Sequence, residues 1–421
     1  MTARLALAAA LLGGCNYLTD SFVINTFSGD PFPTTVDTSS GAIVVGVQEQ
    51  DLTMRTAVLD VLSPITLIDR GPDVAQSVDY PPLVLVGEHV SGGPFDLPRA
   101  RFEAPQVLTL HPCAEPTCAV GTPTSPRPFD AIIGLDTFAS DALRLHLAAD
   151  PTTDPDQIFI LPDIGGDETH RTRACDAVFP TPFRGGGTLL VGGTELAFSN
   201  WRIVVDTCIA PDPDPAKLQS QRGTDALLVA STAIGITLLD RSAYNRYHQL
   251  DPTTPGYDDL TDLETVLLPS GAISGRKTTL PSVAFVAKSG SSPRAPCRQV
   301  YAHHFLTPRD CLSTDTDCPC DGGDTFCNVP AVVELKPPAG IDILVVDDDN
   351  FTLQALRTEL RPDQPEVDGI LGTDALRTLE LDVDYPNARL LGRCSVDRSI
   401  CTTRPELVAG DRTQVLGCIG P

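Results

Sequence analysis

Basic residues are scarce in this chain, which has 30 Lys and Arg against 55 Asp and Glu and a formal net charge of −25. A surface of this sign repels the phosphate backbone of nucleic acids and the headgroups of anionic lipids. We therefore expect no nucleic-acid partner and no membrane partner that binds through the folded surface. The acidic balance itself is explained by solubility.

Long apolar runs are also missing, and the most notable short one lies at the start of the chain. Arg4 is followed by an apolar run over residues 5–12 and by the pair Gly13-Gly14 directly before Cys15. A membrane-spanning helix needs about 20 residues, so this run is too short to span and is typical of a secretory signal. The small residues before Cys15 resemble the lipobox of bacterial lipoproteins. The sequence thus predicts a cleaved signal peptide, a lipid on Cys15 and a soluble body that reaches the membrane only through this anchor.

Motifs for nucleotides, zinc and serine hydrolysis are absent as well. The chain has no GxGxxG or phosphate loop between a strand and a helix, no CxxC pair with a downstream His pair, and no GxSxG elbow. Two weaker metal candidates are His303-His304 and the aspartates of CLSTDTDCPCDGGD, but the latter lack the spacing of an EF-hand loop. We interpret both as solvated surface and predict no cofactor and no metal.

Thirteen cysteines are present, and an oxidising compartment makes disulfides the default for those that remain after Cys15. Close spacing predicts local bridges between Cys113 and Cys118 and between Cys394 and Cys401, and the other pairings stay open. With 38 Pro, 33 Gly and many short runs such as AIVVGV and RIVVDT, the composition predicts an all-β chain of short strands.

Two pairs of matching segments divide the chain into two copies of one plan. DVLSPITLIDR at residues 60–70 matches STAIGITLLDR at residues 231–241, and DAIIGLD at residues 130–136 matches DGILGTD at residues 368–374. Between its two segments the second copy is longer by about 67 residues, and the extra length holds a cysteine-rich stretch. A chain of this length is also too long for one small sandwich, so two lobes are expected.

These observations predict the organisation of the whole chain. Asn16, rather than Asp, follows Cys15, which by resemblance to envelope lipoproteins favours the outer membrane. We expect a lipid-anchored protein of the bacterial cell envelope that faces the periplasm or the surface. The predicted segments are a signal peptide (1–14), a tether (15–40), a first lobe (41–195) and a second lobe (196–421) with a cysteine-rich insertion at about 290–335.

The repeated plan resembles that of the pepsin-like and retropepsin-like aspartic proteases, and GILGTDALRTLELDVDYPNARL looks especially like the end of a retropepsin-like lobe. In that family an apolar strand ends in Asp-Thr-Gly, and a later apolar-apolar-Gly segment passes close to the aspartate turn. The resemblance implies an all-β, two-lobed, pepsin-like architecture in which each lobe is a β-barrel-like unit and the aspartates lie in the cleft between lobes. It also places Gly134 and Gly372 beside the turns at Asp60 and Ser231, in agreement with the close backbone approach that a strand Gly indicates.

The chemistry of this family needs two carboxylates that share a proton, one to activate water and one to polarise the peptide carbonyl. The first lobe keeps Asp60, but Val61 and Leu62 replace Thr and Gly. At the equivalent place in the second lobe the repeat puts Ser231, which cannot carry the second charge or the shared proton. Asp60 is therefore the candidate catalytic residue of the first lobe, without an acidic partner.

Asp206 is the alternative partner, because Asp206-Thr207-Cys208 follows the strand WRIVV and reads almost like Asp-Thr-Gly. The shared ITL(I/L)DR tail instead sets the register through Ser231. That register places Asp206 at the end of the opening strand, near the position of Val47 or Gln48 in the first copy. Cys208 is then better interpreted as a disulfide partner than as a replaced Gly.

The sequence therefore favours an envelope lipoprotein with an aspartic-protease-like fold that has lost the dyad. Such a pseudoenzyme is expected to bind an extended peptide or protein in the cleft between its lobes without cleaving it. The alternative is an active aspartic endopeptidase that uses Asp60 with an atypical partner from the second lobe.

Overall fold

The structure is a computed structural model of the 421-residue chain. The predicted signal peptide, Cys15 and most of the cysteine-rich insertion, with its aspartate-rich segment, lie outside the described residues. The described residues are 30–86, 101–148, 156–161, 177–180, 186–199, 202–287, 296–304, 331–359, 366–394 and 400–404, apart from 105, 114–116, 213, 215, 216, 218–220, 386 and 388.

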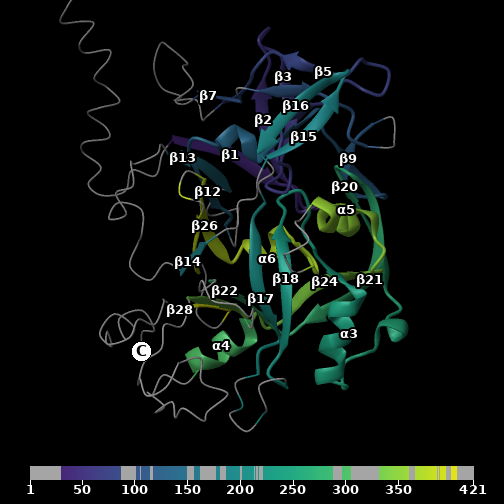
Figure 1. The fold of residues 1–421 in the computed structure, drawn as a ribbon, viewed down its shortest axis with the longest axis vertical. Helices are drawn as coiled ribbons and strands as arrows, with labels where there is room; N and C mark the ends of the chain where they lie inside the picture. The colour runs from purple at the N-terminus through teal and green to yellow at the C-terminus, as the bar shows by residue number, and fades with distance from the viewer. Residues whose placement is uncertain are drawn as a thin grey trace, which may run out of the picture.

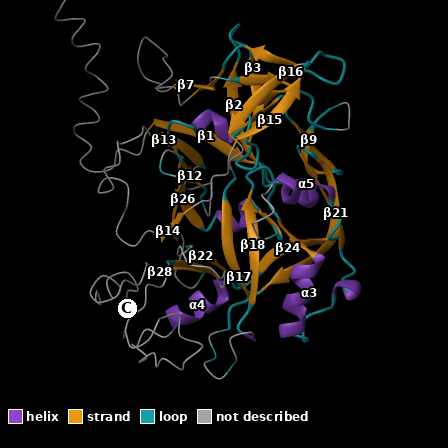
Figure 2. Ribbon diagram, in the orientation of Figure 1, coloured by secondary structure: helices purple, strands orange, loops and turns teal. Residues whose placement is uncertain are grey.

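Strands dominate the described part of the chain, as the all-β prediction requires (Figure 2). The first lobe contains β2 (Ile43–Gln48), β3 (Met54–Leu59), β4 (Leu67–Ile68), β5 (Ser77–Tyr80), β6 (Leu83–Val86), β7 (Arg101–Ala104), β8 (Val107–Thr109), β9 (Ala119–Thr122), β10 (Ser125–Pro128), β11 (Ala131–Ile133) and the 3-10 helix η1 (Leu135–Phe138).

The second lobe has longer strands and carries the α-helices of the described chain, and it lies below the first lobe in Figure 1. Its elements are β17 (Val204–Ile209), β18 (Thr224–Ala230), β19 (Thr237–Asp240), α3 (Arg241–Leu250), η4 (Tyr257–Asp259), β20 (Leu263–Leu268), β21 (Gly271–Leu280), β22 (Val283–Val286), α4 (Pro296–His304), β23 (Val332–Leu335), β24 (Ile341–Val346), α5 (Phe351–Glu359), β25 (Gly369–Leu371), α6 (Thr373–Leu376) and β28 (Cys401–Arg404).

The two lobes repeat one arrangement of strands, which confirms the internal repeat. In the first lobe, β11 lies between β3, to which it is parallel, and β4, to which it is antiparallel. In the second lobe, β25 lies in the same way between β18 and β19. The backbone hydrogen bonds match too: Asp60 N donates to Ile133 O at 3.0 Å, and Ser231 N donates to Leu371 O at 2.9 Å.

A sheet shared by both lobes joins them. Its strands are β1 (Asp30–Val36), β12 (Ala142–His146), β13 (Gln157–Leu161), β14 (Ala177–Pro180), β26 (Leu379–Asp384) and β27 (Arg389–Cys394). The lobes meet where β12 pairs antiparallel with β26. β1 starts at residue 30, so the last part of the segment predicted as a tether is a strand of this sheet.

Two hairpins add further contacts around the first lobe. The β9–β10 hairpin reaches the second lobe, where Gly121 on β9 pairs with Leu267 on β20. The hairpin of β15 (Gly186–Val191) and β16 (Thr194–Ser199) lies beside β5 (Figure 1) and packs Leu189 and Leu196 against the apolar core of the first lobe.

Three disulfides join described residues. Cys113–Cys118 and Cys394–Cys401 confirm the two local bridges predicted from spacing. The third, Cys208–Cys297, ties β17 to α4 and confirms that Cys208 is a disulfide partner. This disulfide therefore links the start of the cysteine-rich insertion covalently to the body of the second lobe.

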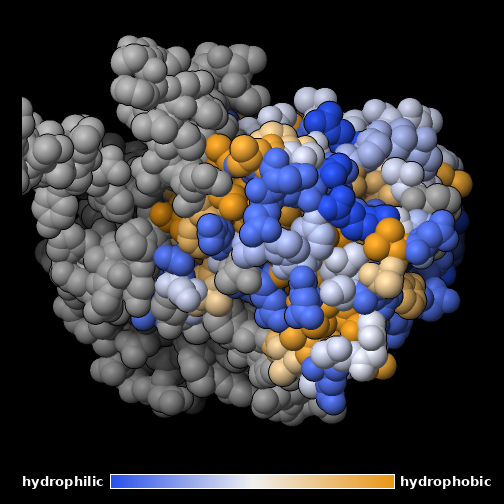
Figure 3. Space-filling model, turned by 90° about the horizontal axis from the view of Figure 1, so that it is seen from above, coloured by the Kyte–Doolittle hydropathy of each residue, from blue (hydrophilic) through white to orange (hydrophobic). Residues whose placement is uncertain are grey.

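The outer surface combines hydrophilic areas with separate hydrophobic patches in the view from above (Figure 3). Large exposed apolar side chains lie at separate places along the chain, among them Leu52, Leu190, Leu263 and Phe351. In the part of the chain that the structure describes, no helix has both the length and the apolar character to cross a membrane.

Candidate functional site

Asp60 and Ser231 meet at the junction of the two lobes. Asp60 follows β3 and Ser231 follows β18, at equivalent places in the repeated plan. The Ser231 Oγ donates a hydrogen bond to the Asp60 Oδ1 at 2.9 Å, and the Leu62 N donates to the same oxygen at 2.9 Å. The structure thus brings together the two residues that the repeat equated, and a hydroxyl stands where a second carboxylate would be needed for a dyad.

Thr232 links the two turns through its hydroxyl group. The Thr232 Oγ1 accepts from the Val61 N at 3.0 Å and donates to the Leu59 O at 2.6 Å. The first lobe has no matching hydroxyl, because the residue after Asp60 is Val61. The side-chain link between the turns is therefore one-sided.

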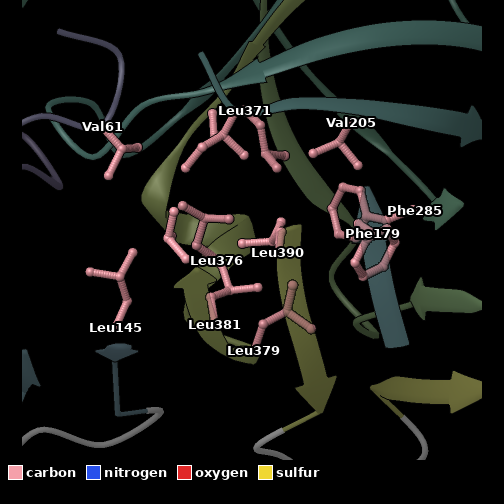
Figure 4. A pocket seen from close by; sticks show the side chains of 13 residues that line it. Val61, Leu145, Phe179, Val205, Phe285, Leu371, Leu376, Leu379, Leu381 and Leu390 are labelled. Carbon is pink, nitrogen blue, oxygen red and sulfur yellow. The ribbon is translucent and has the colours of Figure 1, made fainter. Parts of the chain in front are cut away.

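Val61 faces an apolar cavity instead (Figure 4). The cavity has a volume of about 20 Å³ and is lined by apolar side chains from both lobes and the shared sheet, including Leu145, Phe179, Leu371 and Leu381. That volume is close to the space one water molecule requires, and the walls offer it no polar partner. We interpret this cavity as a packing defect beneath the turns and not as a ligand site.

Gly134 and Gly372 lie where the repeat predicts them. A Cβ on Gly134 would be 2.2 Å from the Ile65 O, and a Cβ on Gly372 would be 2.2 Å from the Gly235 O. Both carbonyls belong to the segments that follow the turns at Asp60 and Ser231. The predicted close backbone approach is confirmed in both lobes.

The Asp60 carboxyl group is buried, with 5% of the residue exposed. Burial raises its pKa, while hydrogen bonds from the Leu62 N, the Ser231 hydroxyl and the Thr232 N, and the charge of Arg202, act in the opposite direction. Among the described residues, the groups with the largest effects on this pKa include no other carboxyl group. The charged group among them is the cation Arg202, whereas in a shared-proton dyad the neighbouring group is a second carboxyl group.

Arg202 is a site residue that the sequence reasoning missed. It is buried just before β17, where burial lowers its pKa and the charges of Glu359 and Asp60 raise it. Its Nη2 donates to the Glu359 Oε2 at 2.6 Å. The signal in the sequence was Arg202 itself, a single charged residue in the apolar run WRIVV. A buried cation needs anionic partners, so a charged residue in such a run indicates a buried ion pair.

Asp206 lies within β17 and not in the turn beside Asp60. It pairs with Leu227 on β18 and with Val286 on β22, and Leu227 lies well before Ser231 along the chain. Its charge acts on Asp225, whose pKa is raised chiefly by burial. The structure therefore brings Ser231, and not Asp206, to Asp60.

The register of Asp206 differs slightly from the sequence expectation. Leu227 corresponds to Thr56 in the first lobe, because Asp368 and Asp130 hold the two in the same way. Thr56 pairs with Gly46, so Asp206 corresponds to Gly46 and not to Val47 or Gln48. Outer strands share no sequence motif between the copies, which is why the spacing there was misjudged by a residue or two.

Contacts between the lobes are formed close in sequence to Asp60 and Ser231. Leu62 packs against apolar clusters of the second lobe, and the Gly235 N donates to the Ser40 O at 2.7 Å. Ser231 is fully buried.

Side chains of the types that can bind a metal ion gather at one place among the described residues, formed by His111, Cys113 and Cys118. The two cysteines form a disulfide, so they offer no thiolate to an ion in this state. His303-His304 forms the end of α4, and the side chains of this pair are outside the described part.

Comparisons with known proteins find distant structural similarities for this chain. No family model and no curated protein matches it. Among solved structures, it is similar to basic 7S globulin from soybean, at 12% identity over 86% of this chain and 94% of that chain with a TM-score of 0.38. It is also similar to an aspartic proteinase from Irpex lacteus, at 14% identity over 86% of this chain and 96% of that chain with a TM-score of 0.37.

Structural similarity at these TM-scores indicates nothing about activity. The fold is assigned from the strand arrangement of the chain itself. The repeated strand insertion, the paired turns and the shared sheet are those expected from the sequence. The chain therefore has an all-β, two-lobed, pepsin-like fold, with Asp60 and Ser231 at the two positions where that plan brings the lobes together.

Proposed function

We propose that this protein is a non-catalytic member of the pepsin-like architecture, which binds an extended peptide or protein segment between its lobes. The observation that carries the proposal is the hydrogen bond from the Ser231 Oγ to the Asp60 Oδ1. One carboxyl group and one hydroxyl cannot share a proton and activate water in the way a pair of carboxyls does.

Two further features argue against hydrolysis. The charge of Arg202 lowers the pKa of Asp60 and so favours its ionised form. In a dyad, a second carboxyl group of like charge separates the two pKa values instead. The burial of Asp60 and Ser231 also argues against contact between their side chains and a scissile bond. Binding does not need that access, because extended peptides dock through main-chain hydrogen bonds and side-chain pockets.

The deciding experiment uses the soluble body from Asn16 onward with unfolded protein at acid and neutral pH, with and without an aspartic-protease inhibitor. We expect no inhibitor-sensitive cleavage, and we expect fluorescence anisotropy to show that Asp60→Asn binds labelled unfolded peptides as tightly as the parent chain. Inhibitor-sensitive cleavage that disappears in Asp60→Asn would establish the alternative, an active aspartic endopeptidase. Loss of the same activity in Asp206→Asn would also place Asp206 in the working site.

We further propose that the protein is carried on a bacterial lipoprotein anchor at Cys15, in the cell envelope and at the outer membrane. The support is the short apolar signal and the small residues before Cys15. In detergent phase separation of whole cells, the parent chain should enter the detergent phase, whereas Cys15→Ser should remain an uncleaved precursor or leave the membrane. Mature-length Cys15→Ser in the detergent phase would contradict the anchor.

A further inference from the structure

Asp69, His111 and the disulfide Cys113–Cys118 gather at one end of the first lobe. β4 and β8 are parallel neighbours, with Leu67 paired to Leu108 and Ile68 to Thr109. The chain therefore leaves both strands at the same edge of the sheet, where Asp69 follows β4 and His111 lies just beyond β8. The topology thus brings a carboxylate, an imidazole and two sulfurs together from two segments.

The side chains form a line of hydrogen-bonding contacts. The His111 Nδ1 lies 2.8 Å from the Asp69 Oδ1, which also accepts from the Gly71 N at 2.8 Å. The His111 Nε2 lies 3.5 Å from the Cys113 Sγ, and the Nδ1 lies 3.7 Å from the Cys118 Sγ. A carboxylate on Nδ1 holds the proton there and turns Nε2 toward the sulfur. This is the order of groups that activates a cysteine: carboxylate, imidazole and sulfur.

The other described disulfides lack this setting. Cys208 and Cys297 are both buried, and the Cys208 Sγ is near the Arg222 O. Cys394 has the Thr403 hydroxyl at 3.1 Å from its sulfur. Within the part of the chain that the structure describes, an imidazole accompanies the sulfurs only at Cys113–Cys118.

The second lobe also lacks the arrangement at the equivalent place. Asp240 corresponds to Asp69, but its side chain caps α3 through the Ala243 N at 2.7 Å and pairs with Arg357. The same position therefore serves helix formation in one lobe and imidazole orientation in the other. This difference argues that the first-lobe cluster is not a by-product of the repeated plan.

We propose that Cys113–Cys118 is a redox-active disulfide that exchanges with dithiols of peptides or proteins. A substrate thiolate attacks the Cys113 Sγ, which is partly exposed, and the bond to the buried Cys118 breaks with release of the Cys118 thiolate. That thiolate takes up a proton. The second substrate thiol, once deprotonated, attacks the substrate sulfur in the mixed disulfide and releases the Cys113 thiolate.

The balance is a two-electron oxidation of the substrate dithiol to a disulfide and a two-electron reduction of Cys113–Cys118 to two thiols. His111 holds a proton on Nε2 toward the released Cys113 thiolate, and Asp69 stabilises the imidazolium. A better-stabilised leaving thiolate speeds release of the product. This activity does not depend on the peptide-binding function proposed for the lobe junction.

The first test follows electron transfer in the full chain, purified in mild detergent, with a fluorogenic reduced dithiol peptide. We expect the oxidised protein to oxidise the peptide. In the reverse direction, the free Cys113 thiolate of Cys118→Ser should attack the disulfide form of the same peptide, release one peptide thiolate and form a mixed disulfide on Cys113, which mass spectrometry of the acid-quenched protein locates. The matched control, Cys394→Ser/Cys401→Ser, removes a disulfide of similar spacing and should leave the rate unchanged. Oxidation by Cys113→Ser/Cys118→Ser at the parent rate overturns the proposal.

The second test isolates the part played by His111. In the Cys118→Ser background, iodoacetamide alkylation of Cys113 is measured against pH by mass spectrometry. Replacing His111 with Gln should slow alkylation about tenfold near pH 6 and move the profile to higher pH, because the thiolate loses its cationic partner. Asp69→Asn should shift it in the same direction. Superimposable profiles with and without the His111→Gln substitution, at unchanged circular dichroism, refute the assigned role.

Discussion

Thr232 joins the turns of the two lobes through one hydroxyl group, which accepts a hydrogen bond from the Val61 N and donates one to the Leu59 O. Both backbone groups are buried, so removal of the hydroxyl leaves a donor and an acceptor without this partner. We predict that Thr232→Val lowers the free energy of unfolding by about 2–4 kcal/mol, since each unsatisfied buried group costs about 1–3 kcal/mol. Urea unfolding measures the difference. Thr232→Ser keeps the hydroxyl and should cost clearly less; equal losses would show that the hydroxyl is not the cause.

Asp136 gives a pH prediction of defined sign. Burial raises its pKa from 3.8 to about 6, although the Thr66 hydroxyl and backbone and the Thr137 N donate to it. A raised acid pKa stabilises the fold fully below pH 3.8, and this contribution is lost as the pH rises through about 6. Asp136→Asn should remove this pH dependence, worth about 2–3 kcal/mol at about 1.4 kcal/mol per pKa unit. Urea unfolding at several pH values between 4 and 7 tests it.

Asp51 provides the control of opposite sign. It is exposed, and hydrogen bonds from the Thr53 N and side chain lower its pKa. Its contribution to stability is therefore lost as the pH falls, and Asp51→Asn should have a small effect in the direction opposite to Asp136→Asn. Matching pH profiles for the two variants would contradict the burial argument.

At the level of elements, the short strands β11 and β25 depend on the glycines that follow them. A Cβ on Gly134 or Gly372 would lie 2.2 Å from a backbone carbonyl oxygen. We predict that Gly134→Ala and Gly372→Ala each lower the free energy of unfolding by about 3 kcal/mol, the upper end of the usual overpacking range. Gly46→Ala on β2 is the matched control, because its Cβ meets only the Met54 Cε at 3.4 Å. An effect of equal size at Gly46 would refute the close-approach explanation.

The two copies of the strand segment ending in Asp-Arg lead to different elements. After β19, the Asp240 side chain accepts from the Ala243 N and α3 begins. After β4, the chain continues as Gly71-Pro72, and Gly71 has φ +85°, which a right-handed helix does not allow. The Asp is common to both copies, whereas the Gly-Pro pair follows only the first, so the Gly-Pro pair is the local residue signal for this divergence.

At the scale of the whole molecule, the lobes are coupled by an ion pair across the shared sheet. The Arg144 Nε and Nη2 donate to the two Asp382 carboxylate oxygens at 2.6 and 2.7 Å, between β12 and β26. The Asp382 side chain is 4% exposed. We predict that Arg144→Met lowers the free energy of unfolding by about 3–5 kcal/mol, because it removes the bidentate guanidinium group from a buried carboxylate.

The double variant Arg144→Met/Asp382→Leu should recover most of that loss, since apolar replacements of a buried pair are often neutral. Denaturant unfolding followed by the single Trp, Trp201, and by far-ultraviolet circular dichroism should give coincident transitions in the parent chain, because the lobes share one sheet. A double variant no more stable than Arg144→Met would show that the loss is not electrostatic.

The sequence by itself determined the repeat, the all-β class, the two local disulfides and the pairing of Asp60 with Ser231. Each of these depends on residues close together in the chain or on two segments alike enough to be aligned, such as ITLIDR and ITLLDR. Hydrophobic patterning and short-range spacing act locally, so they can be recognised before folding is known.

Only the tertiary structure decided what surrounds Asp60 and where the remaining chemistry lies. The burial of Asp60, the approach of Arg202 and the Cys208–Cys297 bridge join segments with no shared motif. The line from Asp69 to His111 exists because β4 and β8 are parallel neighbours, which no local pattern specifies. Contacts of this kind follow from how strands are ordered in a sheet, and that order is set by packing of the whole chain.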